Sequence, residues 1–278
     1  EKWWMRHRTM PAVAVFAGAH SSELAPVHRM VERGMCTLDV IPVGPSGIVD
    51  VRDVARAIHP NTVVVAVQSC SNEIGVLQPV EEIAALCRRA GVMYHCDSSQ
   101  DFAKVKRDFS QCSSMVFAAH KIGVMVGLGV LWLAPDTFAR IEPQIFGGTQ
   151  QRDMRGGTLS AVLCAALSAS LKELRELCRG DGTVVGGLSG EPLRLAYMRD
   201  TLAKYLLDNV QGARINGAVD PYVWEPQAVT DASKRKRLYS NLNLTLPGVC
   251  PVSLNAELAP YIDVSAAAAC KSLGGDRS

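Results

Sequence analysis

The chain has 278 residues, of which 48% are hydrophobic and 20% charged, and its formal net charge is +2. A chain of this balance is not disordered and can bury one large core or a core and part of a second domain. The weak net charge gives no indication of nucleic acid as a partner. No apolar run reaches the roughly 18 to 20 residues that a membrane-spanning helix needs, so we expect no membrane partner.

Short apolar runs alternate with helix-like segments along the first half of the chain. The apolar runs are rich in β-branched residues, as buried strands are, and the segments between them end at glycine or proline, as helices do. In chain order we expect strands at residues 12–17, 37–43, 62–67, 91–97 and 115–119, and helices at 22–34, 51–58 and 79–90. This alternation predicts an α/β fold with a mainly parallel sheet and helices on both faces.

The pattern changes after Thr158. We expect a long helix at 159–177, a glycine-rich surface loop at 179–190, a further helix at 194–207 and a strand at 242–246. The chain is therefore predicted to consist of a large domain, residues 1–158, incomplete at its N-terminus, and a helical connection with part of a smaller α+β domain, residues 159–278.

The cysteines indicate the compartment. There are nine, scattered mostly through apolar segments, without a CxxC pair or a regular spacing. This distribution is typical of reduced thiols in an intracellular protein, and it does not decide between mitochondria, cytoplasm and nucleus. The one basic run, Lys234 to Arg237, is interpreted as a solvated loop, with an import signal or a phosphate-binding patch as the less favoured alternatives.

Polar side chains follow several of the expected strands. Asn72, Asp97, His120 and Lys121 each come at or just after a strand end. In parallel sheets the carboxyl ends of the strands share one edge, and ligands bind there. A lysine can hold an aldehyde carbonyl while a carboxylate holds a protonated ring nitrogen, so Lys121 with Asp97 suggests pyridoxal phosphate as cofactor. Taken singly, each residue is more simply a helix cap or a surface charge.

A metal site is not expected. His95, Cys96 and Asp97 are consecutive on one expected strand, and neighbouring side chains on a strand point to opposite faces. The three therefore cannot bind one metal ion together. We interpret His95 as a hydrogen-bonded core residue.

Five segments together resemble cysteine desulfurases and selenocysteine lyases in order and spacing. They are Ser71-Asn-Glu-Ile-Gly-Val-Leu-Gln-Pro-Val80, Tyr94-His-Cys-Asp-Ser-Ser-Gln100, Ala119-His-Lys-Ile122, Phe146-Gly-Gly-Thr-Gln-Gln-Arg-Asp-Met-Arg-Gly-Gly-Thr158 and Val264-Ser-Ala-Ala-Ala-Ala-Cys270. The resemblance covers about residues 12–278. It implies a dimeric, fold-type-I pyridoxal-phosphate enzyme of the class-V aminotransferase group, whose large domain, residues 1–158, binds the cofactor.

The resemblance also implies roles for the cofactor-binding residues. Lys121 would hold the aldehyde carbon and Asp97 the ring nitrogen, while His20 would stack on the ring and take part in catalysis. Asn72 and Gln100 would donate to the ring hydroxyl, His120 would contact the phosphate or move protons, and Thr158 would reach the phosphate held by the partner subunit.

Cys270 is the implied acceptor of the chalcogen. As a thiolate it would take sulfur or selenium from the substrate and keep it as a persulfide or perselenide. The implied partners are L-cysteine or L-selenocysteine, a second copy of the chain, and a protein that accepts the sulfur or selenium.

Several positions depart from the family pattern. Ser71 replaces an asparagine, and Ala118 replaces a serine. The loss of the serine hydroxyl at position 118 removes a phosphate contact worth roughly 1 to 3 kcal/mol. An aromatic and a basic residue expected after Ile122 are absent. So are an upstream phosphate-binding turn and a downstream arginine for the substrate carboxylate. We therefore expect a chain truncated at both ends or a degenerate relative.

These residues support several functions. The favoured one is a cysteine desulfurase that converts L-cysteine to L-alanine and supplies sulfur for iron-sulfur cluster or thio-cofactor assembly. The alternatives are a selenocysteine lyase that yields alanine and selenide, and a non-catalytic relative that acts as a binding partner. An aminotransferase is disfavoured because transamination has no use for a cysteine loop.

Overall fold

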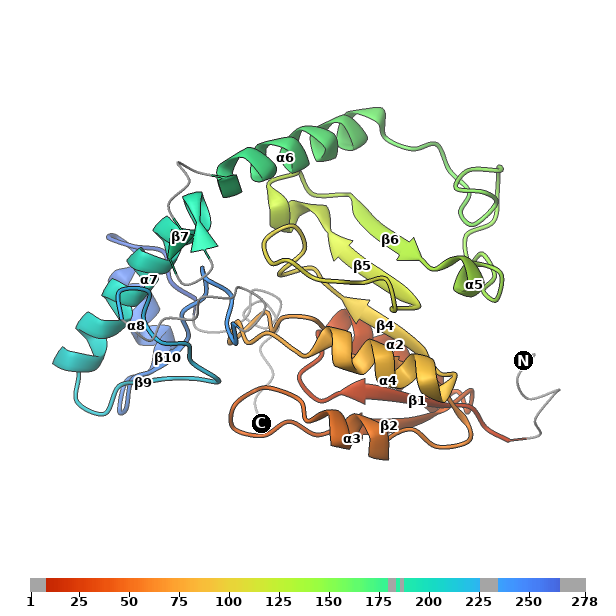
Figure 1. The fold of residues 1–278 in the computed structure, drawn as a ribbon, viewed down its shortest axis with the longest axis horizontal. Coiled ribbons are helices and arrows are strands. Elements are labelled where there is room, and N and C mark those ends of the chain that lie inside the picture. Colours follow the sequence, from red (N-terminus) through yellow and green to blue (C-terminus); the bar gives the residue numbers. More distant parts are fainter. Residues whose placement is uncertain (1–8, 180–183, 186–187, 226–234, 266–278) are drawn as a thin grey trace.

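A six-stranded sheet organises the first half of the molecule. The computed structural model describes residues 9–179, 184–185, 188–225 and 235–265. The strands lie in the order β2-β1-β3-β4-β5-β6. Their bounds are β1 Ala12–Phe16, β2 Thr37–Ile41, β3 Thr62–Ala66, β4 Met93–Asp97, β5 Ser114–Ala118 and β6 Gly129–Leu133. The first five strands are parallel to their neighbours and β6 is antiparallel to β5 (Figure 1).

Helices cover both faces of this sheet. The first three are α2 Ser21–Glu32, α3 Val51–Arg56 and α4 Val80–Ala90. Along β1, Ala14 and Phe16 pack in the core that includes residues of α3 and α4. Val13 and Val15 point the other way and pack in a core with residues of α2. The expected parallel sheet with helices on both faces is confirmed.

The remaining elements follow β5 in the chain. They are η1 Ala119–Ile122, α5 Pro135–Phe138, α6 Ala161–Arg179, β7 Val184–Val185, β8 Leu188–Ser189, α7 Gly190–Asn209, β9 Arg214–Ile215, β10 Leu244–Thr245 and α8 Pro251–Leu258. Leucines of α6 pack against Met115 and Phe117 of β5. In Figure 1, α6 runs along the β5–β6 side of the sheet and leads toward α7. No described helix is long and apolar enough to cross a membrane.

Two expectations about the second half were wrong. The expected surface loop at 179–190 includes the paired strands β7 and β8, and α7 begins at Gly190, four residues before the expected helix start. Leu188 is buried against the core that contains Leu193, so this part of the stretch is not solvated. The elements β6 and α8 were not expected at all.

The basic run is also not the solvated loop that its composition suggested. Lys234 lies outside the described residues, but Arg235 and Arg237 are 7% and 3% exposed. The reason is that distant segments supply acceptors. Asp220 lies 3.8 Å from the Arg235 guanidinium and accepts a hydrogen bond of 3.2 Å from the backbone N–H of Arg237. The Arg237 guanidinium donates to the carbonyls of Asn216, Ala218 and Ile74.

These contacts hold the loop that follows β3. The backbone N–H of Leu77 donates to Lys236 at 2.8 Å, and that of Leu238 donates to Gly75 at 2.8 Å. Gly75 has φ +67°, and a Cβ there would lie 2.4 Å from the Asn241 side chain, so only glycine fits this approach. The C-terminal half of the chain thereby fixes the loop that carries Asn72.

Candidate functional site

The order of the strands brings four of the expected site residues to one edge of the sheet. His20 follows β1, Asn72 follows β3, Asp97 ends β4 and Lys121 follows β5. Because β1, β3, β4 and β5 are consecutive in the sheet and parallel, their carboxyl ends adjoin. In Figure 1 the arrowheads of β1 and β5 both point toward the side on which α7, β9 and β10 lie.

Asp97 presents one carboxylate oxygen to this edge. The residue is 8% exposed. Its Oδ1 atom accepts hydrogen bonds from the backbone N–H of Ser99 at 2.9 Å and from the Ser99 hydroxyl at 2.6 Å. Its Oδ2 atom accepts none from the part of the chain that the structure describes. A buried carboxylate with one oxygen available can accept a hydrogen bond from a ligand N–H group.

His20 begins helix α2. It is the N-cap, and its Nδ1 atom accepts from the backbone N–H of Ser22 at 3.2 Å. The preceding turn is fixed from the segment that follows β3, because the Gln68 amide donates to the carbonyl of Gly18 at 2.7 Å. The imidazole is thereby held at the carboxyl end of β1.

Glu23 is a site residue that the sequence interpretation missed. Both of its carboxyl oxygens are buried and have no hydrogen-bond partner among the described residues. Burial and then the negative charge of Asp97 raise the pKa of Glu23 to about 8, which the nearby backbone N–H of His20 offsets only in part. The carboxyl group is therefore protonated at neutral pH. Its position three residues after the helix cap was the available signal.

Lys121 and His120 lie on the single turn η1, and both are exposed. Lys104, from the segment after β4, lies near enough for its charge to interact with that of Lys121. Burial is the main cause that lowers the pKa of Lys104, and the positive charge of Lys121 adds to it. The lysine after β5 is thus placed close to the segment that follows Asp97. Lys104 is a second amine that the sequence interpretation did not consider.

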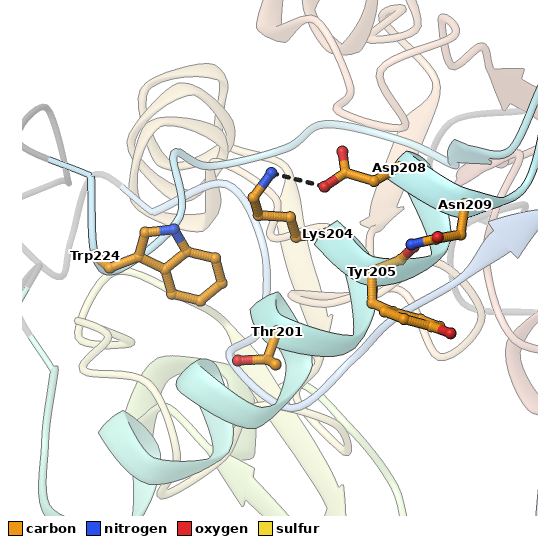
Figure 2. A pocket seen from close by; sticks show the side chains of 6 residues that line it. All are labelled: Thr201, Lys204, Tyr205, Asp208, Asn209 and Trp224. Atoms are coloured by element: carbon orange, nitrogen blue, oxygen red, sulfur yellow. Dashed lines mark hydrogen bonds and ion pairs between the residues drawn. The ribbon is translucent and has the colours of Figure 1, made fainter.

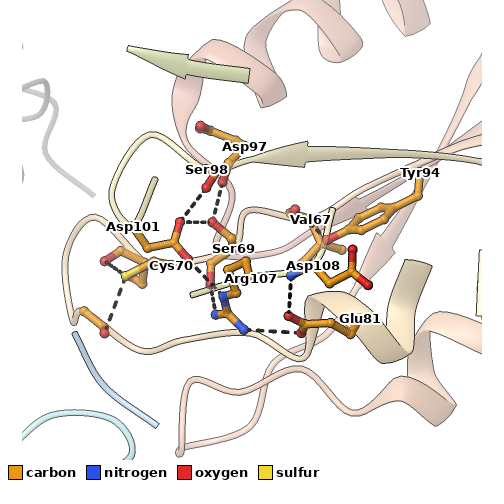
Figure 3. Close-up of polar contacts among 12 residues, drawn as sticks. Val67, Ser69, Cys70, Glu81, Tyr94, Asp97, Ser98, Asp101, Arg107 and Asp108 are labelled. Carbon is orange, nitrogen blue, oxygen red and sulfur yellow. Dashed lines mark hydrogen bonds and ion pairs between the residues drawn. The ribbon is translucent and has the colours of Figure 1, made fainter. Parts of the chain in front are cut away.

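A buried ionic network fixes the turn after Asp97 (Figure 3). The Asp101 side chain is fully buried, and it accepts hydrogen bonds from the hydroxyls of Ser98, at 2.7 Å, and Ser69. Arg107 donates to Asp101 at 3.2 Å and to the carbonyl of Ser69 at 3.2 Å. The backbone N–H of Ser69 donates to the carbonyl of Asp97 at 2.8 Å. The network therefore ties the end of β3 to the end of β4.

The other expected site residues are less closely assembled. Gln100 lies in the half-buried turn after β4. Thr158 is exposed in the segment between α5 and α6, which begins at the opposite edge of the sheet because β6 is antiparallel. Cys270 lies outside the described residues.

His95 is hydrogen-bonded, as expected, but it is half-buried and does not belong to the hydrophobic core. Its Nδ1 atom lies 2.8 Å from the hydroxyl of Ser114, and burial lowers its pKa. Within the described ranges, no group of three or more histidine, cysteine, aspartate or glutamate side chains could hold a metal ion.

A hollow of about 360 Å³ lies elsewhere, on the surface of α7. Figure 2 shows the side chains that line it: Thr201, Lys204, Tyr205, Asp208, Asn209 and Trp224. Lys204 and Asp208 form an ion pair of 2.8 Å with each other. None of the strand-end residues contributes to this hollow, so we do not place the chemistry there.

Comparisons with known proteins show to which family the chain is similar. The family model for class-V aminotransferases matches residues 8–172. The chain is 30% identical over 211 residues to a probable mitochondrial cysteine desulfurase of Dictyostelium discoideum. This match covers 74% of this chain and 40% of that protein. The chain is 29% identical over 246 residues to cysteine desulfurase IscS of Rickettsia akari. This match covers 88% of this chain and 54% of that protein. The chain thus spans about half or less of these relatives.

A solved structure shows the same fold. DndA from Streptomyces lividans has a TM-score of 0.73 and 24% sequence identity, and the match covers 93% of this chain and 67% of that protein. The likeness in fold therefore extends over nearly the whole chain.

Proposed function

Because this chain belongs to the class-V aminotransferase family, we propose that it is part of a pyridoxal-phosphate-dependent cysteine desulfurase. The observation that carries the proposal is the meeting of Lys121 and Asp97 at one sheet edge. The names of the two curated relatives support cysteine as the substrate. In this proposal the chain converts L-cysteine to L-alanine and supplies sulfur for iron-sulfur cluster or thio-cofactor assembly.

The chemistry of the side chains fits pyridoxal phosphate. Lys121 offers an exposed amine for the aldehyde, and the largely buried Asp97 offers a carboxylate oxygen for the ring N–H. His20, Asn72, Gln100 and His120 complete the set that would hold the ring and the phosphate. When bound, the cofactor withdraws electrons from the substrate bond that breaks. Asp97 keeps a proton at the ring nitrogen, and Lys121 gives or takes a proton beside the substrate carbon.

Cys270 takes the sulfur in this proposal. Its thiolate forms a sulfur–sulfur bond with the substrate sulfur, whose bond to carbon breaks, and the carbon skeleton leaves as L-alanine after protonation. Selenium in place of sulfur would make the same residue the acceptor in a selenocysteine lyase, and the relatives' names favour sulfur.

A homodimer belongs to the same proposal. Large apolar side chains are exposed from the end of η1 to the first turn of α6, among them Val126 at 78%, Phe146 at 82% and Val162 at 67%. Such exposure supports an interface with a second copy. In the same proposal, Thr158 reaches the phosphate that the partner subunit holds.

Cys270→Ser tests the sulfur step. With pyridoxal phosphate and L-cysteine added, we expect the parent chain to form L-alanine and carry a persulfide, and the variant to lose the persulfide and most of the alanine. Alanine is measured by amino-acid analysis and persulfide by mass spectrometry. Cys164→Ser is the control, since Cys164 is exposed on α6. Persulfide at an undiminished level in the Cys270 variant would contradict the role of this residue.

A further inference from the structure

Glu23 and Asp97 lie on the same side of the sheet. Glu23 is in the first turn of α2, which covers the face that includes Val13 and Val15. Val64 packs in the same core and pairs with Met93 of β4. Since side chains alternate along a strand, Asp97, four residues after Met93, also points to the α2 face. The two carboxyl groups therefore approach from a helix and a strand that are far apart in the sequence.

The titratable groups around Glu23 are few. Asp97 acts on it from β4, and His20 stands at the start of its own helix. Strand β1, against which α2 packs, carries none. On β2, Asp39 pairs with Ala14, whose side chain lies in the core of the opposite face. No described cation lies within ion-pair distance of Glu23, and its oxygens are buried without a partner.

We propose that Glu23 is a second carboxyl group at the ring-nitrogen end of the cofactor, which keeps its proton in the cofactor-free protein and releases it when the positively charged ring nitrogen binds at Asp97. This inference rests on the proposed cofactor site. A cation brought beside Asp97 favours the charged form of a neighbouring carboxyl group. The O–H bond of Glu23 would then break and the proton would pass to solvent, so that the negative charge of Glu23 would add to that of Asp97 in holding the ring nitrogen. Glu23 is thus a positioning residue.

The number of protons released on cofactor binding tests this inference. Pyridoxal phosphate is titrated into the cofactor-free chain at pH 7 by calorimetry, in two buffers with different ionisation enthalpies. A group with a pKa of about 8 is mostly protonated at pH 7. We therefore expect the parent to release close to one proton more per bound cofactor than Glu23→Gln, which has no proton to give. Glu32→Gln, at the exposed end of the same helix, should release as many protons as the parent.

The outcomes separate the inference from the proposed function. Equal proton release by the parent and Glu23→Gln would overturn the role of Glu23 and leave the cofactor site intact. Failure of both proteins to bind the cofactor, seen as no change in visible absorbance, would overturn both proposals.

Unfolding of the cofactor-free protein gives an independent readout. Folding raises the pKa of Glu23 from 4.5 to about 8, so the folded state binds more protons between these values. The proton on Glu23 therefore adds to the free energy of unfolding of the parent relative to that of Glu23→Gln. This contribution is complete below about pH 4.5 and is lost as the pH rises to about 8. We expect the melting temperature of the parent to fall relative to that of the variant across this window. A difference that does not change with pH would show that Glu23 holds no proton there.

Discussion

Lys121→Ala should abolish the visible absorbance band that pyridoxal phosphate gives with the parent chain. The band requires a covalent bond between the cofactor aldehyde and an amine, and Lys121 is the exposed amine at the end of β5. Phosphate and ring contacts remain in the variant, so weak binding without the band is expected. A spectrophotometric titration at equal protein concentrations measures both.

Two other lysines make this test specific. Lys106→Ala is the matched control, because Lys106 is exposed in the segment after β4 and is not expected to touch the cofactor. Lys104 is the competing amine, since burial lowers its pKa and it lies near Lys121. Reduction with borohydride followed by peptide mass spectrometry identifies the modified lysine. Label on Lys104 in the parent, or a full band in Lys121→Ala, would refute the assignment.

The sheet edge was predictable because it depends on local sequence and one general rule. The apolar runs before Asp97 and Lys121 marked their strands, and parallel strands put their carboxyl ends together. The strand order that makes β1, β3, β4 and β5 neighbours was not visible, because it depends on packing between distant segments. The antiparallel strand β6 was missed for a related reason: its glycine-containing apolar run has no alternation that would distinguish a strand.

The predictions from the sequence were wrong mainly where a charged side chain is buried by distant segments. Arg237 lies in a basic run that composition assigns to solvent, yet its acceptors come from residues 74, 216 and 218. Glu23 sits on a helix with mostly exposed side chains, and only the fold brings it near enough for its charge to interact with that of Asp97. A residue's own neighbours in sequence do not tell whether a distant partner will desolvate or neutralise it.

The two halves of the chain meet at the functional loop. Arg237 and Asn241 hold the carbonyls of Ile74 and Glu73, next to Asn72. The hydrogen bonds of Asp101 with Arg107 and Ser98 hold the turn after Asp97 in the same way, from the segment between β4 and β5. Site residues that sit on loops are therefore fixed by buried polar contacts on both sides, which is what a preorganised site requires.

Arg107→Met should lower the free energy of unfolding by about 3 to 5 kcal/mol, because it leaves a buried carboxylate without its cation. Asp101 is fully buried and would keep only its two serine donors. Methionine keeps much of the apolar volume of the arginine stem, so the loss reflects charge rather than a cavity. Denaturant unfolding measures the change, and the pH is held constant because Glu23 also titrates.

The matched control and a rescue variant decide whether charge is the cause. Arg194→Met breaks an exposed ion pair with Glu191 and should cost only about 0 to 1 kcal/mol. In the double variant Arg107→Met with Asp101→Asn, the amide oxygen still accepts from Ser69 and Ser98, and no charge is stranded. We expect it to recover more than half of the loss. If the double variant is as unstable as Arg107→Met alone, the cost lies in packing, and the ionic network is not what secures the turn that presents Asp97.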